Sequence, residues 1–142
     1  MKRKHWVTRL GAMIGAGAVL GGGLILPLQA QAAAPPFTGC KVIDDYLQYD
    51  FAQDGRWLNT FIKYKCNNGE PYSFEANIIR VSDGSSVAFG GHGGVDTEPY
   101  AIVQSRFCKG SVNTVYKAVW SLQIDGTTKT YTTPKRTLPC SF

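Results

Sequence analysis

The residues best suited to chemistry lie in the segment FGGHGGVDTEPY, residues 89–100. It contains His92, the single histidine after residue 32, and Asp96 and Glu98 follow closely. A histidine with nearby carboxylates can bind a metal ion or act as a general base. A catalytic imidazole must be held in one orientation, and the glycines on both sides of His92 oppose this. We therefore interpret the segment as an exposed connecting or binding loop, with a small hydrolase centred on His92 as an alternative.

Two adjacent carboxylates, Asp44 and Asp45, are a second candidate, because paired carboxylates perform acid–base catalysis in glycosidases. Neighbouring residues in a β-strand point to opposite faces of the sheet. If this segment is a strand, the two carboxylates should not converge on a substrate. We expect a solvated strand edge instead.

A basic segment, Thr133–Cys140 (TPKRTLPC), is a third candidate. Two prolines flank Lys135 and Arg136, and a rigid loop loses little entropy when it binds. Such a loop suits a secreted inhibitor of trypsin-like proteases. The alternative is an edge segment whose prolines and charges prevent sheet-to-sheet aggregation.

Aromatic residues provide a fourth kind of site. Trp57 and Phe61 fit the expected core pattern less well than Tyr116 and Trp120 do. On an exposed face they would contact a protein or a sugar, because aromatic side chains carry much of the energy of interfaces. Carbohydrate is thus a further candidate ligand, although no sugar-specific motif supports it.

The chain begins with the pattern of a secretory signal peptide. Basic residues at 2–9 precede an apolar run at 10–28, and Ala30 and Ala32 are the small residues that signal peptidase requires. We predict cleavage after Ala32 and secretion to the extracellular space. Of 15 basic residues, 4 lie in the signal, so 11 Lys and Arg face 10 Asp and Glu in the remainder, a net charge of +1. This weak charge argues against nucleic-acid binding, and we expect no membrane contact after cleavage.

The mature chain is expected to be one small domain, residues 40–142, after an extended segment 33–39. Pro35, Pro36 and Phe37 of that segment are candidate contact residues. Cysteines stand at positions 40, 66, 108 and 140 with no Cys-x-x-Cys pair, which is unsuited to structural zinc. In an oxidising destination they form disulfides by default, and a lipid on Cys40 would leave an odd number. No cofactor is expected.

Most of the chain alternates between apolar and polar residues in short segments separated by turns. This period is typical of half-buried β-strands. The inward sets predicted are Leu58, Thr60, Ile62, Tyr64 and Cys66; Tyr72, Phe74, Ala76 and Ile78; and every second residue from Val112 to Ile124. A strand over residues 112–124 would be about 40 Å long, so we expect a bend or bulge in it. The segment YAIVQSRFC, residues 100–108, is predicted to be a more buried strand.

Turn signals complete the fold prediction. Asp125-Gly126 predicts a type I′ hairpin. Residues 41–51 fit either a helix or a strand, and we favour a strand because Phe51 and Trp57 flank a suitable hairpin loop. About seven antiparallel strands indicate an all-β, immunoglobulin-like sandwich, with a small barrel as the alternative.

The registers of two hairpins predict how the cysteines pair. Extending the register of the turn at residues 125–126 brings Cys140 close to Cys108. Extending that of the first hairpin brings Cys66 close to Cys40. We therefore predict disulfides Cys40–Cys66 and Cys108–Cys140.

These patterns together predict a secreted, non-catalytic protein-binding or adaptor module. In size, export signal and cysteine count the chain resembles small secreted bacterial proteins such as protease inhibitors, chromophore-carrying sandwiches and adaptor subunits of antibacterial toxin particles. The expected partner is another secreted or cell-surface protein, contacted through the APPFTG segment or an edge strand. A serine-protease inhibitor using Thr133–Cys140 is the rival function.

Overall fold

The computed structural model describes residues 33–52 and 55–142, so the predicted signal peptide lies outside the described residues. The described chain is built of β-strands that alternate between apolar and polar residues. The strands are β1 (Cys40–Ala52), β2 (Gly55–Cys66), β3 (Glu70–Arg80), β4 (Ser86–Asp96), β5 (Tyr100–Gln104), β6 (Gly110–Ile124), β7 (Thr127–Thr132) and β8 (Arg136–Ser141).

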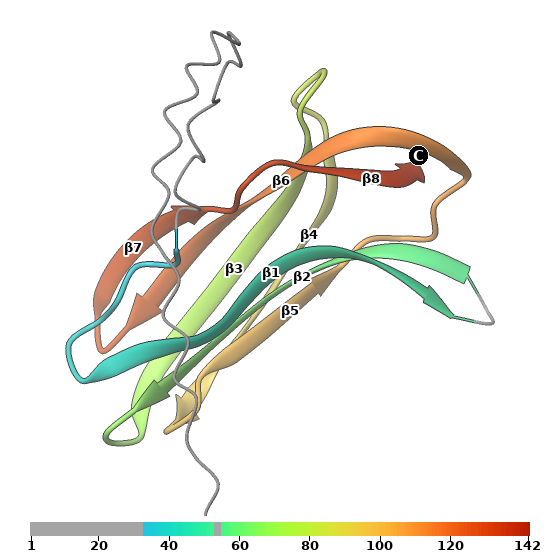
Figure 1. Cartoon of the computed structure of the whole chain (residues 1–142). Coiled ribbons are helices and arrows are strands. Elements are labelled where there is room, and N and C mark those ends of the chain that lie inside the picture. Colours follow the sequence, from blue (N-terminus) through green and yellow to red (C-terminus); the bar gives the residue numbers. More distant parts are fainter. Residues whose placement is uncertain (1–32, 53–54) are drawn as a thin grey trace, which may run out of the picture.

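The strands form two antiparallel sheets that stack face to face (Figure 1). One sheet has the order β1-β2-β5, and the other has the order β4-β3-β6-β7, with β8 pairing with β6 beyond the end of β7. The predicted all-β sandwich is confirmed, with eight strands instead of about seven. Within residues 33–52 and 55–142 there is no helix of the length and apolarity that a membrane crossing requires.

The core lies between the sheets and includes the predicted inward positions of β2 and β3 and those of β6 from Tyr116 onward. Burying one large apolar side chain contributes about 1.5–3 kcal/mol, so this layer dominates the stability of the fold. The largest buried side chains are Leu58, Ile62, Tyr64, Phe74, Ile78, Tyr116, Trp120 and Leu122. Val112, expected on the same face, is instead 68% exposed. A register shift between Gly110 and Asn113 interrupts the pairing with β8 there, which places the expected bulge at the start of β6.

The hairpin between β6 and β7 has the predicted turn. Asp125 and Gly126 have φ angles of 46° and 74°, and Ile124 pairs with Thr127. Positive φ at both central positions is what a type I′ turn requires. The turn therefore sets the register of both strands.

The first hairpin is longer than predicted. Residues 40–52 are a strand, as we favoured, but pairing continues to Ala52 and Gly55, and Phe51 pairs with Arg56 instead of Trp57. The predicted five-residue loop is wrong, because the ladder extends into it. A register shift between Val42 and Asp44 then offsets the pairing toward the start of β1.

Both predicted disulfides are confirmed. Cys40 and Cys66 face each other at the start of β1 and the end of β2, at a separation of 26 residues in sequence. Cys108, just before β6, bonds to Cys140 of β8 across a separation of 32 residues. Each bond joins segments that the sheets already bring together.

The N-terminal segment packs onto the sandwich. Ala34 and Phe37 are buried, with 4% and 6% of their surfaces exposed. The Tyr64 hydroxyl donates to the Pro35 carbonyl at 2.8 Å, and Lys129 Nζ donates to the Pro36 carbonyl at 2.6 Å. The expectation that this segment offers Phe37 to a partner is wrong, because the ring packs against the core.

The glycine-rich segment around His92 is part of strand β4, so the loop prediction is wrong. His92 pairs with Phe74 in an antiparallel ladder with β3. A Cβ atom on Gly91 would lie 2.3 Å from the Phe74 carbonyl oxygen, and one on Gly93 would lie 2.9 Å from that of Tyr72. The glycines therefore allow a close approach of two strands.

The basic segment after β7 is also mostly a strand. Arg136 pairs with Tyr116, and only residues 133–135 connect β7 to β8. The Thr133 hydroxyl accepts the Ala118 N–H at 2.9 Å and fixes this connection. Residues 136–141 are thus a paired edge strand, and the free-loop prediction is wrong for residues 136–140.

Candidate functional site

The outward side chains of the three-stranded sheet bring aromatic rings together. Tyr46 of β1 pairs with Phe61 of β2, and Phe61 pairs with Ile102 of β5. The ring centroid of Tyr100 lies 6.4 Å from that of Phe61. We call these four residues, Tyr46, Phe61, Tyr100 and Ile102, the aromatic face.

The aromatic face is turned to solvent. Tyr100 is 44% exposed and Ile102 is 51% exposed, whereas Ala101 and Val103 between and beyond them are buried. The prediction of a more buried strand is thus wrong for β5, which alternates. An antiparallel sheet usually carries polar residues on its solvent side, and a contiguous apolar patch there marks an interaction surface.

One pair of rings in the aromatic face is stacked. The centroids of Tyr46 and Phe61 are 5.2 Å apart with 23° between the ring planes. The buried Thr60 hydroxyl donates to the Tyr46 carbonyl at 2.9 Å, which fixes this part of β1. Partial burial, and then the charges of Asp44 and Asp50, raise the pKa of the Tyr46 hydroxyl. Like an ordinary tyrosine hydroxyl, it is protonated at neutral pH and can donate to a ligand.

A charged rim borders the aromatic face. Lys63 Nζ lies 2.5 Å from Glu98 Oε2, and Asp44 stands opposite Lys63 in the ladder between β1 and β2. The hydrogen bond from Lys63, and then its charge, lower the pKa of Glu98. The Glu98 N–H donates to Asp96 Oδ1 at 3.0 Å, in the corner between β4 and β5. Of the predicted acidic residues, Glu98 thus borders the site and Asp96 shapes the corner.

His92 adds a further ring beside this face. Its centroid lies 5.7 Å from Tyr100 and 6.0 Å from Tyr72. Over residues 33–52 and 55–142, no group of three or more His, Cys, Asp and Glu side chains is placed to hold a metal ion. His92 therefore contributes through its ring, at the edge of the aromatic face.

The predicted residue Trp57 lies toward the opposite end of β2. Its ring centroid is 5.9 Å from that of Phe107, which is 55% exposed. Phe107 is a surface residue that the sequence pattern missed, because the segment around it was expected to continue a buried strand. Trp57 and Phe107 form a second, smaller aromatic cluster, whereas Phe61 belongs to the aromatic face.

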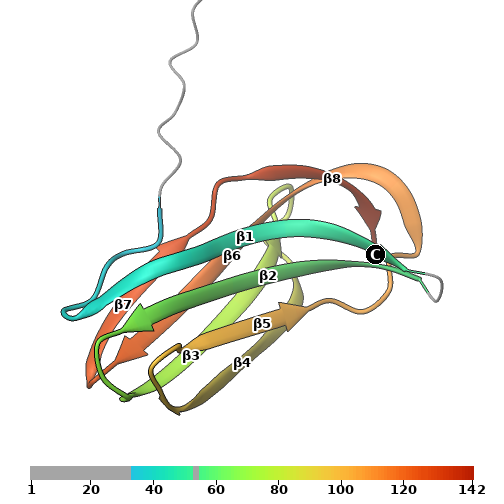
Figure 2. The same ribbon diagram turned by 60° about the horizontal axis from the view of Figure 1, so that its bottom comes forward.

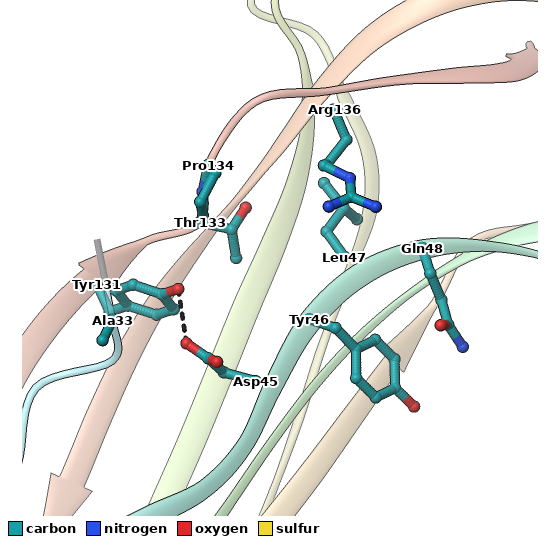
Figure 3. Close-up of a pocket in the computed structure, with 9 residues that line it drawn as sticks. All are labelled: Ala33, Asp45, Tyr46, Leu47, Gln48, Tyr131, Thr133, Pro134 and Arg136. Atoms are coloured by element: carbon teal, nitrogen blue, oxygen red, sulfur yellow. Dashed lines mark hydrogen bonds between the residues drawn. The ribbon is translucent and has the colours of Figure 1, made fainter. Parts of the chain in front are cut away.

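A pocket of about 280 Å³ lies between β1 and the connection from β7 to β8 (Figure 3). Asp45 Oδ2 accepts hydrogen bonds from the Tyr131 hydroxyl at 2.8 Å and from the Ala34 N–H at 3.1 Å. Tyr46 points away from Tyr131, toward the other side of β1. The lining contains no serine, cysteine or histidine, so it has no pairing of such a nucleophile with an imidazole base. The polar groups of the pocket therefore serve to hold β1, β7 and the N-terminal segment together.

The remaining predicted residues lie apart from the aromatic face. Asp44 and Asp45 point to different sides of β1, as expected, since one pairs beside Lys63 and the other contacts Tyr131. Arg136 lines the pocket (Figure 3), while Lys135 is exposed in the short connection before β8.

Comparison with known proteins finds partial matches among solved structures. No family model and no curated protein matches this sequence. A crystal structure of a glycosyl hydrolase family 2 member from Bacteroides cellulosilyticus DSM 14838 is similar, with 10% identity and a TM-score of 0.48, over 66% of this chain and 14% of that chain. A second structure of such a member, from microfluidic crystals, has the same identity and TM-score over 13% of its chain. The matched part is a small fraction of those proteins.

Proposed function

We propose that this chain is a secreted, non-catalytic module that binds another protein through the aromatic face. The observation that carries the proposal is the exposure of Tyr100 and Ile102 beside the stacked pair of Tyr46 and Phe61. Aromatic anchors surrounded by a polar rim are typical of protein–protein interfaces. Here Lys63 and its ionic partner Glu98 supply that rim.

The geometry favours a protein over a sugar. A sugar stacks on open ring faces, but Tyr46 and Phe61 each turn one face toward the other. Ile102, next to them, has no group that can hydrogen-bond to a hydroxyl. An apolar side chain of another protein would fill the space beside Ile102 without losing hydrogen bonds.

Secretion rests on the predicted signal peptide and is supported by the two disulfides, because such bonds persist mainly in oxidising compartments. The partner is then another secreted or cell-surface protein, or the other subunit of a secreted complex.

The two rival functions have less support. An inhibitor loop must protrude into a protease, but Arg136 belongs to a paired strand and faces a pocket (Figure 3). A hydrolase needs an oriented base, and the described contacts of His92 are with the rings of Tyr72 and Tyr100.

The proposal is tested by capturing the partner from spent culture medium on the immobilised mature chain. We expect wild type to retain a specific protein, identified by mass, and Ile102→Lys to lose it. A charge in the centre of an apolar contact should weaken binding by about tenfold or more. Val112→Lys is the matched control, because Val112 is 68% exposed and lies outside the aromatic face.

Equal loss of capture in Val112→Lys and Ile102→Lys would refute a role for the aromatic face. Binding of the same chain to a glycan array, lost with Ile102→Lys and without any captured protein, would point to a sugar ligand instead. Circular dichroism of each variant confirms that the fold is intact.

A further inference from the structure

Strand β4 is an unprotected edge of the larger sheet. It stands at the end of the strand order and pairs with β3 on one side. Figure 2 shows it along the border of the sandwich, next to β5 of the other sheet. Gly91 and Gly93 are exposed, so the free side of their backbone is open to solvent. An open row of N–H and C=O groups is a template for pairing with another strand.

The other edges of the sandwich carry features that prevent such pairing. β1 has the charged residues Asp44 and Asp50 and a register shift, and β5 is 5 residues long. β7, at the opposite end of the larger sheet, is 6 residues long and contains Lys129, and β8 contains Arg136 and Pro139. In β4, by contrast, residues 86–95 (SVAFGGHGGV) include no Asp, Glu, Lys, Arg or Pro. Natural proteins usually protect a long edge strand against pairing with another strand. The lack of such protection in β4 indicates that another strand pairs with it.

The sequence of β4 is symmetric about His92. Phe89 stands three residues before it and Val95 three residues after it, with two glycines on each side. Phe89 and Val95 pair with Asn77 and Pro71 of β3, on the outer face of the sheet. They are 70% and 73% exposed, the largest exposures among the large apolar residues of the described chain.

We propose that β4 is a self-association edge, at which a second copy of this chain adds its own β4 in antiparallel register. The two-fold axis passes midway between the two strands at the level of His92, so His92 faces its counterpart in the second copy. Phe89 of each copy then faces Val95 of the other, and each glycine faces a glycine. Such an interface is isologous, because the same contacts occur twice.

The second copy fits this edge better than an unrelated strand does. Antiparallel pairing about His92 covers Phe89 and Val95 of both chains at once, which places apolar side chains opposite each other on one face. The glycines leave room for the two backbones to approach, and no Asp, Glu, Lys or Arg side chain meets another across residues 86–95. An unrelated strand would need the same spacing of apolar residues around small ones.

The experiment measures the oligomeric state of the mature chain by sedimentation velocity over a series of protein concentrations. We expect wild type to show a monomer–dimer equilibrium. Phe89→Lys combined with Val95→Lys puts lysine opposite lysine twice, so the dimer dissociation constant should rise by about tenfold or more. Phe89→Lys combined with Val95→Glu puts lysine opposite glutamate twice, so its dissociation constant should return close to that of wild type.

This pair of variants tests the register, because both remove the same apolar side chains. Wild type that stays monomeric at every concentration would overturn the inference, as would equal loss of the dimer in both variants. The inference is independent of the aromatic face: loss of the dimer in Ile102→Lys, with the dimer retained in Phe89→Lys/Val95→Lys, would move the association to that face and refute pairing through β4.

Discussion

The indole N–H of Trp120 donates a hydrogen bond to the hydroxyl of Thr60, 3.1 Å away in the opposite sheet. Both side chains are fully buried. The same hydroxyl donates to the carbonyl of Tyr46, whose ring belongs to the aromatic face. One buried hydroxyl thus connects the core of the five-stranded sheet to the strand that carries the candidate binding surface.

Replacing that hydroxyl should destabilise the fold. Thr60→Val keeps the shape of the side chain but leaves the indole N–H of Trp120 without an acceptor in the core. We expect a loss of about 1–3 kcal/mol in the free energy of unfolding, measured by urea titration. Thr130→Val, an exposed change in β7, is the matched control and should have little effect. Equal losses in the two variants would show that the buried hydrogen bond contributes nothing.

The two disulfides should contribute about equally to the free energy of unfolding. The loops closed by Cys40–Cys66 and Cys108–Cys140 span 26 and 32 residues, so each bond contributes about 3.5 kcal/mol in the chain-entropy model. We expect each double alanine variant to melt well below wild type in differential scanning calorimetry. A variant that melts with wild type would indicate that the sheets alone constrain its two segments.

Alanine substitutions of two glycines in β4 should differ sharply in their effect on the free energy of unfolding. Gly91→Ala brings a Cβ atom to 2.3 Å from the Phe74 carbonyl oxygen, so the strands must separate, at a cost of about 1–3 kcal/mol. Gly94→Ala meets the Tyr72 ring at 3.5 Å, an ordinary contact, and should be neutral. Urea unfolding compares the two variants. Equal stabilities would mean that Gly91 is not needed for a close approach of the strands and that the segment is flexible, as a loop would be.

Alkaline pH should weaken the fold through two buried tyrosines. Burial, and then the hydrogen bond with Asp45, raise the pKa of Tyr131, and burial, and then the charge of Asp45, raise that of Tyr64, both above the ordinary value of 10.0. The fold therefore favours the neutral phenols. Their contribution is complete below about pH 10, the pKa of a tyrosine in the unfolded chain, and is lost as the pH rises above it.

The expected slope is up to about 1.4 kcal/mol per pH unit for each of the two groups. Urea titrations between pH 9 and 11 (about one unit on either side of the ordinary tyrosine pKa) measure it. Tyr131→Phe should show a shallower decline than wild type, because one phenol no longer has to stay protonated. An unchanged slope would contradict a raised pKa at this residue.

Local patterns in the sequence determined the strands, their inward faces and the disulfides. A period of two residues is read within one segment, so the buried sets of β2 and β3 could be predicted without knowledge of their neighbours. The turn at Asp125-Gly126 is equally local, because its two residues need positive φ. Two such registers were enough to pair Cys40 with Cys66 and Cys108 with Cys140, even though one register was off by one residue.

The tertiary structure decided which side chains come together on the surface. The four residues of the aromatic face come from three strands, and their contact depends on which strands pair and in what register. The glycines around His92 looked like a flexible loop, because a close approach between strands is visible only when the neighbouring strand is in place. Side-chain alternation is a property of one strand, whereas a binding face is a property of neighbouring strands, and only the folded sheet brings those together.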